Sequence, residues 1–550
     1  MKSTRHLATG VSLLALAAMA TLSTSTLASS HRQLIPLKPL GHVGSYVPPH
    51  VDPYLTPGTW TDLTHAFPGA GPDTSLLLTD GTVLMHDYCT SNWWKLTPDN
   101  TGSYDNGTWS AVTAMPAGYG PALFASEILP DGKMIVSGGL SNNSGSGCDT
   151  PYTTLGALYD PTVGVGGTWT SVSVTGVAPP WTTIGNAASV ILPIGSYMLA
   201  NCCNVQEAIT TNDGLTWTAT GTGKADSNIE EGWTNLPTPF PTLGEILTVD
   251  ASLGSGSCTG GANPVELYHA VGIQAGTWTD AGCTFSALVG PLFNIGPAVL
   301  RPDGIVVYFG ATGNINLANA LISPPTWTAG PSFTGGFDVA EGPAALMPNG
   351  NIMVQASLGY SRDALHAVPG PVGSQFFVFK YSNNTLHPVP GPASAPHITS
   401  SEGRFLVLPT GQLLWSNDGQ TGYPEVATYT PGGTFHAGWR PVVTSVATTL
   451  VEPSTGNPIS GKKFNGWSQG ATYGDDAQES TNYPIVRIRN NSTGHVCFGR
   501  SYNFSSMGVW TAGTTNAVFD LPGPCDTGAS LLQVIVNGIP SKGTRVTVTS

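Results

Sequence analysis

The stretch SLLLTDGTVLMH (75–86) consists of two apolar arms joined by a turn of Asp and Gly. Apolar arms on either side of such turn residues are typical of a β-hairpin. The pattern returns six more times, as SEILPDGKMIVSGG (126–139), ASVILPIGSYMLANC (188–202), FPTLGEILTVD (240–250), PAVLRPDGIVVYFG (297–310), PAALMPNGNIMVQA (343–356) and RFLVLPTGQLLWSN (404–417). The turn glycines lie 46 to 63 residues apart, the length of a four-stranded propeller blade with inserted loops. The sequence therefore predicts a seven-bladed β-propeller.

A second marker follows the hairpins. The motif GTW or a relative of it occurs after five of them, at Trp109, Trp169, Trp217, Trp278 and Trp327, and a degenerate form, NNTLHPV, occupies 383–389. We interpret these segments as outer strands whose aromatic side chains fill the space between blades. One further copy, GTWTDL (58–63), precedes the first hairpin. Trp60 then supplies the outer strand of the last blade and closes the ring, unless the GGTF stretch near Phe435 does so.

Composition supports an all-β chain. Of 550 residues, 69 are Gly and 45 are Pro, which disfavours helical bundles and coiled coils. The apolar share of 40% is too high for a disordered chain. A net charge of −14 argues against the basic surface that nucleic-acid binding requires.

The chain divides into four segments. Residues 1–28 have the basic start, apolar run and small-residue end of a secretory signal peptide. Residues 29–57 are Pro-rich and are expected to form a linker. The propeller is expected over 58–440. Short alternating strands over 441–550 predict an immunoglobulin-like β-sandwich. We expect a secreted monomer, extracellular or periplasmic, that does not span a membrane.

Eight cysteines suit an oxidising compartment, and their even number suits four disulfides. The pairing does not follow from spacing. Neighbours Cys202 and Cys203 either bond to each other or reach two partners, and Cys497 and Cys525 are close enough in sequence for a local bridge.

The chain resembles the galactose oxidase and glyoxal oxidase family of secreted copper-radical enzymes, which combine kelch-type blades with a C-terminal sandwich. The most specific part is RFLVLPTG (404–411) followed by VATYTP (426–431) and WRPVVTS (439–445). QGATYGDDAQESTNYPIVRI (469–488) is similar to the family's last domain, in which a loop enters the propeller channel.

That resemblance implies a copper held by two tyrosines and two histidines, one tyrosine being cross-linked to a cysteine. The family's Tyr-His pair falls on Ser401 and Glu402, the cross-linked tyrosine near Asn186, the cysteine near 124–126 and the last histidine near 474–476. None of these positions carries the family's residue. We therefore expect a galactose oxidase-like scaffold without the copper-radical site, without the oxidase reaction and without a cofactor.

Polar residues instead recur nine positions before the turn glycines. If equal offsets lie on one ring, Asn186, Asn235, Glu341 and Glu402 meet at the channel mouth, and Asp475 and Asp476 approach it from the last domain. Oxygen ligands of this kind suit sugar hydroxyls or a hard cation such as Ca²⁺. In the simpler interpretation these groups only bond to backbone N–H groups of neighbouring blades.

The expected function is therefore binding of a carbohydrate or another cell-envelope ligand. The alternative is an enzyme acting on sugars at the same channel mouth, either an oxidase or a glycosidase or lyase that uses two carboxylates.

Overall fold

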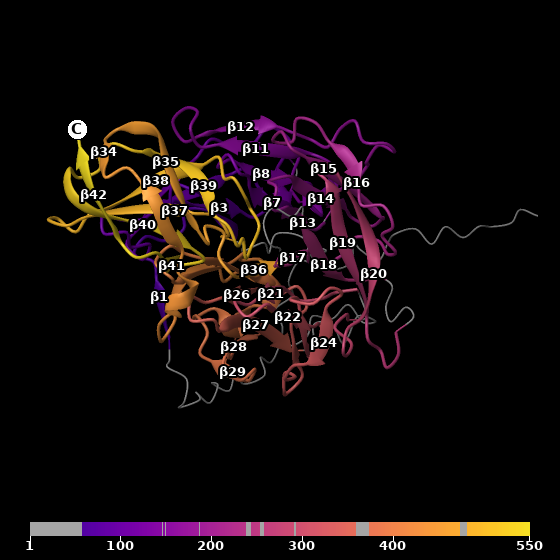
Figure 1. Ribbon diagram of the computed structural model, residues 1–550. Helices are drawn as coiled ribbons and strands as arrows, with labels where there is room; N and C mark the ends of the chain where they lie inside the picture. Colours follow the sequence, from indigo (N-terminus) through magenta and orange to yellow (C-terminus); the bar gives the residue numbers. More distant parts are fainter. Residues whose placement is uncertain are drawn as a thin grey trace, which may run out of the picture. The chain divides into compact units, whose positions relative to one another are not determined.

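The computed structural model describes residues 58–145, 147–148, 150–185, 187–237, 244–252, 258–290, 293–358, 373–472 and 481–550. The predicted signal peptide and linker lie outside these residues. Within them, strands form seven sheets of the kind expected for propeller blades and one larger C-terminal sheet (Figure 1). The predicted all-β class and the count of seven blades are confirmed.

Blades 1 to 4 each have four antiparallel strands. From the innermost strand outward, blade 1 contains β2 (Pro72–Leu77), β3 (Val83–Asp87), β4 (Trp93–Thr97) and β5 (Thr108–Ala111), and blade 2 contains β7 (Ala125–Ile128), β8 (Met134–Ser137), β11 (Gly156–Asp160) and β12 (Thr168–Ser171). Blade 3 contains β13 (Ser189–Ile191), β14 (Tyr197–Asn201), β15 (Gln206–Thr210) and β16 (Thr218–Thr220). Blade 4 contains β17 (Thr234–Asn235), β18 (Glu245–Val249), β19 (Pro264–Gly272) and β20 (Ala275–Cys283). A small additional sheet contains β6 (Pro121–Ala122), β9 (Ser141–Asn142) and β10 (Thr150–Pro151).

Blades 5 to 7 complete the ring. In the same order, blade 5 contains β21 (Ala298–Leu300), β22 (Ile305–Phe309), β23 (Ile315–Asn319) and β24 (Thr326–Ala329). Blade 6 contains β26 (Ala344–Leu346) with the short β25 (Phe337–Asp338), then β27 (Ile352–Leu358), β28 (Ser374–Phe379) and β29 (Leu386–Val389). Blade 7 contains β30 (Gly403–Val407), β31 (Leu413–Asn417), β32 (Glu425–Thr430) and, as its outer strand, β1 (Thr59–Asp62). In the part of the ring that the structure describes, three short 3-10 turns lie near blade 7, at Ala395–His397, Ser400–Glu402 and Ala437–Trp439.

The ring closes through the first described strand. β1 pairs with β32, and Trp60 lies opposite Tyr429. This confirms the closure predicted from the GTW motifs and excludes the GGTF alternative. The Trp60 ring also packs against Phe376 of blade 6 and Trp415 of blade 7, with centroids 5.3 and 6.0 Å away. The chain is therefore closed by an aromatic contact between blades as well as by a strand ladder.

The hairpin turns form as the sequence predicts. All seven turn glycines have positive φ, between 77° and 108°, which glycine adopts without strain. Strands β2 and β3 are buried throughout, whereas the outer strand β5 is mostly exposed. The apolar hairpins thus form the core between blades, as expected for their composition.

The antiparallel order gives the ring two distinct sides. Loops that lead into the innermost strands, and loops between second and third strands, lie on one side, which we call the loop face. Turns between first and second strands, which contain the glycines, lie on the other side, which we call the turn face.

The C-terminal region is a β-sandwich-like, curled sheet. Its strands run in the order β33 (Val442–Val446), β35 (Ser454–Lys462), β39 (Thr515–Leu521), β38 (Val496–Tyr502), β37 (Ile485–Asn490), β40 (Gly528–Val536), β42 (Thr544–Thr549) and β34 (Thr449–Val451), with β41 (Ile539–Pro540) beside β40. The first half of β38 pairs with β37 and its second half with β39. One strand therefore joins the two halves around an apolar interior that includes Phe519 and Leu532.

This region docks on the turn face. The Tyr483 hydroxyl donates to the Leu77 carbonyl at 2.5 Å, and an Arg500 guanidinium nitrogen donates to the Asp131 carbonyl at 2.9 Å. A further strand, β36 (Gln469–Thr472), pairs with the innermost strand β21 of blade 5 and also contacts β26 and β17 (Figure 1). The C-terminal region thus reaches the centre of the ring.

All eight cysteines form disulfides, namely Cys89–Cys148, Cys202–Cys203, Cys258–Cys283 and Cys497–Cys525. The local bridge in the C-terminal region is as predicted, and the neighbouring cysteines bond to each other. Four disulfides favour an oxidising, extracellular or periplasmic location. Within the described residues, no helix has the length and apolar character needed to cross a membrane.

Candidate functional site

Backbone strain in the propeller concentrates on the loop face. Among its described residues, nine non-glycine residues have positive φ, and two of these lie toward the turn face, Asp213 and Asn384. The other seven lie in loops of the loop face: Cys89, Leu123, Tyr152, Cys203, Glu230, Phe293 and Glu341. Such conformations persist only where the surrounding structure holds them, and they cluster at functional sites. The loop face is therefore the side of the ring that favours a functional site.

The structure describes three of the six residues that the sequence singled out. Asn186, Asp475 and Asp476 lie outside the described residues. Glu341, Glu402 and Asn235 are all buried, but they do not share one environment.

Glu341 stands in the loop that leads into blade 6. Its φ is 53°, its backbone N–H donates to the Ile295 carbonyl at 3.2 Å, and its carboxylate accepts a short hydrogen bond from the Asn294 amide. The side chain thus bonds toward blade 5.

Glu402 bonds in the opposite direction, within blade 7. Its Oε1 accepts from the backbone and hydroxyl of Thr399 at 3.1 and 3.2 Å. Its Oε2 accepts from the backbone and hydroxyl of Thr421 at 3.3 and 2.9 Å. Both oxygens therefore tie two loops of the loop face together. This is the arrangement of the simpler interpretation, in which the carboxylate satisfies backbone N–H groups.

Asn235 does not lie at the level of Glu341 and Glu402. It pairs with Ile246, the second residue of β18, and its Nδ2 donates to the Ile191 carbonyl at 3.0 Å. The backbone carbonyl of Glu402 instead accepts from the backbone N–H of Asp418, which directly follows the last residue of β31, the strand that pairs with β30. Asn235 therefore does not lie on the ring expected from equal offsets. The reason is that the connection between β17 and β18 is longer than the corresponding turns of the other blades. Counting back nine residues therefore ends near the turn face.

A surface pocket lies on the loop face where blade 7 meets blade 1. We call it the rim pocket, and its volume is about 290 Å³. Its polar side chains are Asp62, His65 and Glu425, and its aromatic wall is Phe67, which packs against Trp109 at 5.2 Å between centroids. The remaining lining residues are Leu63, Ala66, Gly69, Pro72, Pro424 and Val426.

Two polar side chains of the rim pocket, Glu425 and His65, are held by the backbone. Glu425 accepts from the N–H groups of Ala393 and Ser394 at 3.2 and 2.7 Å. The Nδ1 atom of His65 lies 2.9 Å from the Gly107 carbonyl. Carboxylate and imidazole groups beside an aromatic wall suit a ligand with hydroxyl groups and an apolar face.

A stacked aromatic pair adjoins the rim pocket. Tyr423 directly precedes Pro424, is 47% exposed and stacks on His397 with centroids 4.2 Å apart and planes 12° apart. Tyr423 and Thr421 share a loop, and so do His397 and Thr399. Glu402 thus holds together the two loops that carry this pair. Sequence reasoning missed Tyr423 because no repeat marks this loop.

A smaller cavity lies at the centre of the ring, beneath the C-terminal region. We call it the hub cavity, and its volume is about 20 Å³. Its polar side chains are Glu127 from β7, Asn235, Gln469 and Asn482, with Tyr483 beside them. Its apolar lining is Ile128, Val190, Ile191, Met507 and Val509. Burial raises the pKa of Glu127 to about 8. The available sequence signal was an acidic residue inside an otherwise apolar hairpin arm.

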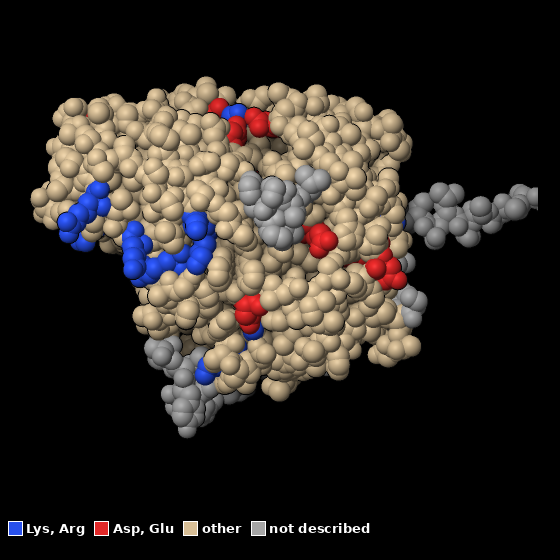
Figure 2. Space-filling model, viewed as in Figure 1, with Lys and Arg blue, Asp and Glu red and all other residues tan. Residues whose placement is uncertain are grey.

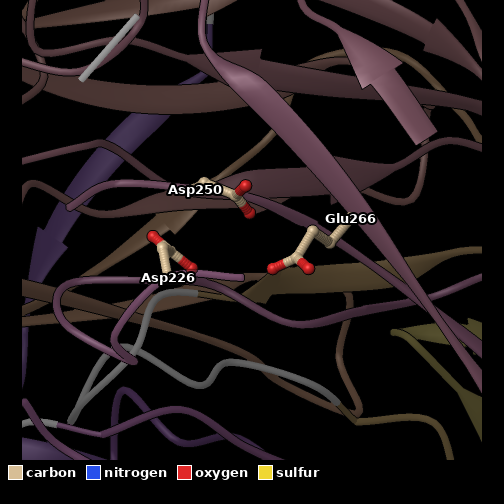
Figure 3. Close-up of side chains that lie close together, drawn as sticks. All are labelled: Asp226, Asp250 and Glu266. Atoms are coloured by element: carbon tan, nitrogen blue, oxygen red, sulfur yellow. The ribbon is translucent and has the colours of Figure 1, made fainter. Parts of the chain in front are cut away.

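A buried charge cluster lies between blades 3 and 4. The carboxylates of Asp226, Asp250 and Glu266 point toward one another, and one oxygen from each lies within 4.8 Å of the others (Figure 3). The Lys224 ammonium lies among them, 2.6 Å from Glu266 and 3.6 Å from Asp250, and it forms a short contact with Asp226. A fourth carboxylate, Glu231, is 3.0 Å from the same nitrogen. Lysine is therefore the cation of this cluster.

One ammonium does not balance four buried carboxylates. Burial raises the pKa of Asp250 to about 8 and raises the pKa of Glu231 well above its usual value, and the Lys224 ammonium only partly opposes this. The neighbouring Glu207 has its pKa raised to about 8, again chiefly by burial. These acids thus hold protons near neutral pH, which reduces the buried negative charge.

The surface in Figure 2 is mostly uncharged, and its Lys, Arg, Asp and Glu side chains form a few separate groups. This agrees with a charged share of only 9%.

The chain was compared with known proteins. No family model and no curated protein matches it. Among solved structures, it is similar to a fungal alcohol oxidase of the AA5 family in complex with copper, with 14% identity over 90% of this chain and 100% of the other and a TM-score of 0.49. It is also similar to the extracellular domain of a putative hybrid two-component system from B. thetaiotaomicron, with 9% identity over 90% and 60% and a TM-score of 0.43. Virginiamycin B lyase from Staphylococcus aureus matches with 10% identity over 68% and 99% and a TM-score of 0.40. These similarities concern the fold and assign no activity to the chain.

Proposed function

We propose that the protein is an extracellular carbohydrate-binding propeller whose ligand occupies the rim pocket on the loop face. The observation that carries the proposal is the pocket of about 290 Å³ that combines Asp62, His65 and Glu425 with an aromatic wall. Its volume is at the lower end of the range for small-molecule sites, which suits one or two sugar units. The exposed ring of Tyr423 offers an apolar face beside it.

The proposal gives the predicted site residues a changed role. Glu402 is a positioning residue that fixes the loops carrying Tyr423 and His397, through its bonds to Thr399 and Thr421. The concentration of strained residues on the loop face supports this side of the ring as the binding side.

The proposal includes no copper. Of the copper-ligand positions that the family resemblance marks, Ser401 and Glu402 are described, and their side-chain oxygens are already engaged with Thr399 and Thr421. Copper(II) sites in proteins rely on imidazole nitrogen or thiolate sulfur as well as oxygen. A hydroxyl and a hydrogen-bonded carboxylate do not provide that set of ligands.

The test is a glycan array followed by calorimetric titration with the best ligand. Tyr423→Ala and Asp62→Asn should each weaken binding about tenfold or more, equivalent to roughly 1.4 kcal/mol. Ile322→Ala, which truncates an exposed side chain on the turn face, is the matched control and should bind normally. Normal binding by Tyr423→Ala would contradict the proposed site. New reducing ends or hydrogen peroxide during incubation would favour the enzymatic alternative.

A further inference from the structure

The hub cavity contains oxygen atoms without partners. Within the part of the chain that the structure describes, the carboxylate of Glu127 accepts no hydrogen bond and forms no ion pair. The Oδ1 atom of Asn235 also has no hydrogen-bond partner, although this residue is only 5% exposed. Buried polar atoms nearly always have a partner. The carboxyl of Glu127, which is partly exposed, and the buried oxygen of Asn235 therefore line the same small space.

The cavity has no positive group of its own. None of its lining residues is Lys, Arg or His, and Glu127 is the one acidic side chain among them. Burial raises the pKa of Glu127 to about 8, so its carboxyl holds a proton at neutral pH unless a cation takes the place of that proton. That cation must come from solvent. The volume of about 20 Å³ has room for one particle of the size of a water molecule.

We propose that the hub cavity binds one sodium ion, held by the carboxylate of Glu127 and the side-chain oxygen of Asn235. Hard cations take oxygen ligands, and this cavity offers carboxylate and carboxamide oxygens. One positive charge balances the single carboxylate, whereas a divalent ion would leave an excess charge in a buried place. Gln469 contributes a further oxygen, which accepts the Asn235 backbone N–H at 2.9 Å.

The position of the ion gives it a structural role. Glu127 belongs to blade 2, Asn235 to blade 4 and Gln469 to the strand that the C-terminal region inserts into the ring. An ion shared by these three elements joins parts of the chain that are distant in sequence. Because it binds the folded chain and not the unfolded one, it stabilises the fold in proportion to the logarithm of its concentration.

The test compares thermal unfolding of the full chain in sodium chloride and in choline chloride at equal ionic strength. We expect the unfolding temperature to be higher in sodium by about 2 °C or more, with a response that follows binding to a single site. Glu127→Gln and Asn235→Val should each lose the difference. Glu245→Gln, which alters a partly exposed carboxylate on β18, is the control and should keep it.

Three outcomes would overturn the proposal. Equal unfolding temperatures of the wild-type protein in the two salts would mean that water fills the cavity. A sodium response that survives in both Glu127→Gln and Asn235→Val would place the ion elsewhere. A response to calcium chloride without one to sodium chloride would assign the cavity to a divalent ion.

Discussion

Glu207 is a buried carboxylate on β15 whose protonation should affect stability. Its Oε1 accepts from the Asn228 amide at 3.1 Å, and burial raises its pKa to about 8. In an unfolded chain the pKa of a glutamate is about 4.3. Between these two values the folded protein binds more protons than the unfolded one. The free energy of unfolding contributed by this group therefore falls as the pH rises from about 4 to about 8.

Glu207→Gln removes this titration while keeping the acceptor for Asn228. Relative to wild type, the variant should become progressively more stable from pH 5 to pH 8, and the difference should level off above that. Urea unfolding of both proteins at pH 5, 7 and 9 measures it. A difference of the same size at all three pH values would contradict the raised pKa.

Residues of the candidate sites differ in how visible they are in the sequence. Glu341 and Glu402 are conspicuous in the sequence because both lie at the same offset from a turn glycine. In the structure, however, the carboxylate of Glu402 accepts hydrogen bonds from Thr399 and Thr421. Glu127 lies in an apolar hairpin arm and Tyr423 lies in an irregular loop. Neither residue recurs at a fixed position of the repeat. Offsets in sequence locate a residue along a strand, but they do not determine which group its side chain meets.

At the scale of elements, the role of strand β1 in closing the ring can be tested directly by a substitution. Trp60→Ala removes contacts with Phe376, Trp415 and Tyr429 and should lower the free energy of unfolding by roughly 2–4 kcal/mol, judged from truncations of buried aromatics. Loss of the ring should also loosen the ladder between β1 and β32.

The control is Trp327→Ala, which truncates the corresponding residue of blade 5. It should lower stability to a similar degree, but only Trp60→Ala should speed hydrogen exchange of the β32 amides that pair with β1. Equal exchange of those amides in the two variants would mean that Trp60 plays no special part in closing the ring.

The elements were largely predictable because each hairpin carries its own signal. Apolar arms and a turn glycine specify a local pairing, so the turns and most inner strands formed where expected. Blade 4 is the exception. Its innermost strand is Thr234–Asn235, before the stretch 240–250 that resembled the other hairpins, and residues 238–243 lie outside the described residues. Because the connection between β17 and β18 is long, β17 lies earlier in the sequence than the repeat implies.

At the scale of the molecule, the C-terminal region and the propeller should unfold together. β36 adds a fifth strand to blade 5, and Tyr483 and Arg500 bond to turns of blades 1 and 2. We therefore expect a single calorimetric transition whose van't Hoff enthalpy matches the measured enthalpy. Two separate transitions would show that these contacts do not couple the two regions.

The sequence by itself determined the all-β class and the seven blades, and it favoured the closure through Trp60. These features depend on periodicity and on residues that are near each other in the chain, where composition dictates local pairing. Only the tertiary structure decided which side chains meet at the rim pocket, the hub cavity and the Lys224 cluster. Each of these brings together residues from different blades or from the C-terminal region. Their proximity depends on loop lengths and side-chain packing, and one sequence without its fold does not specify these.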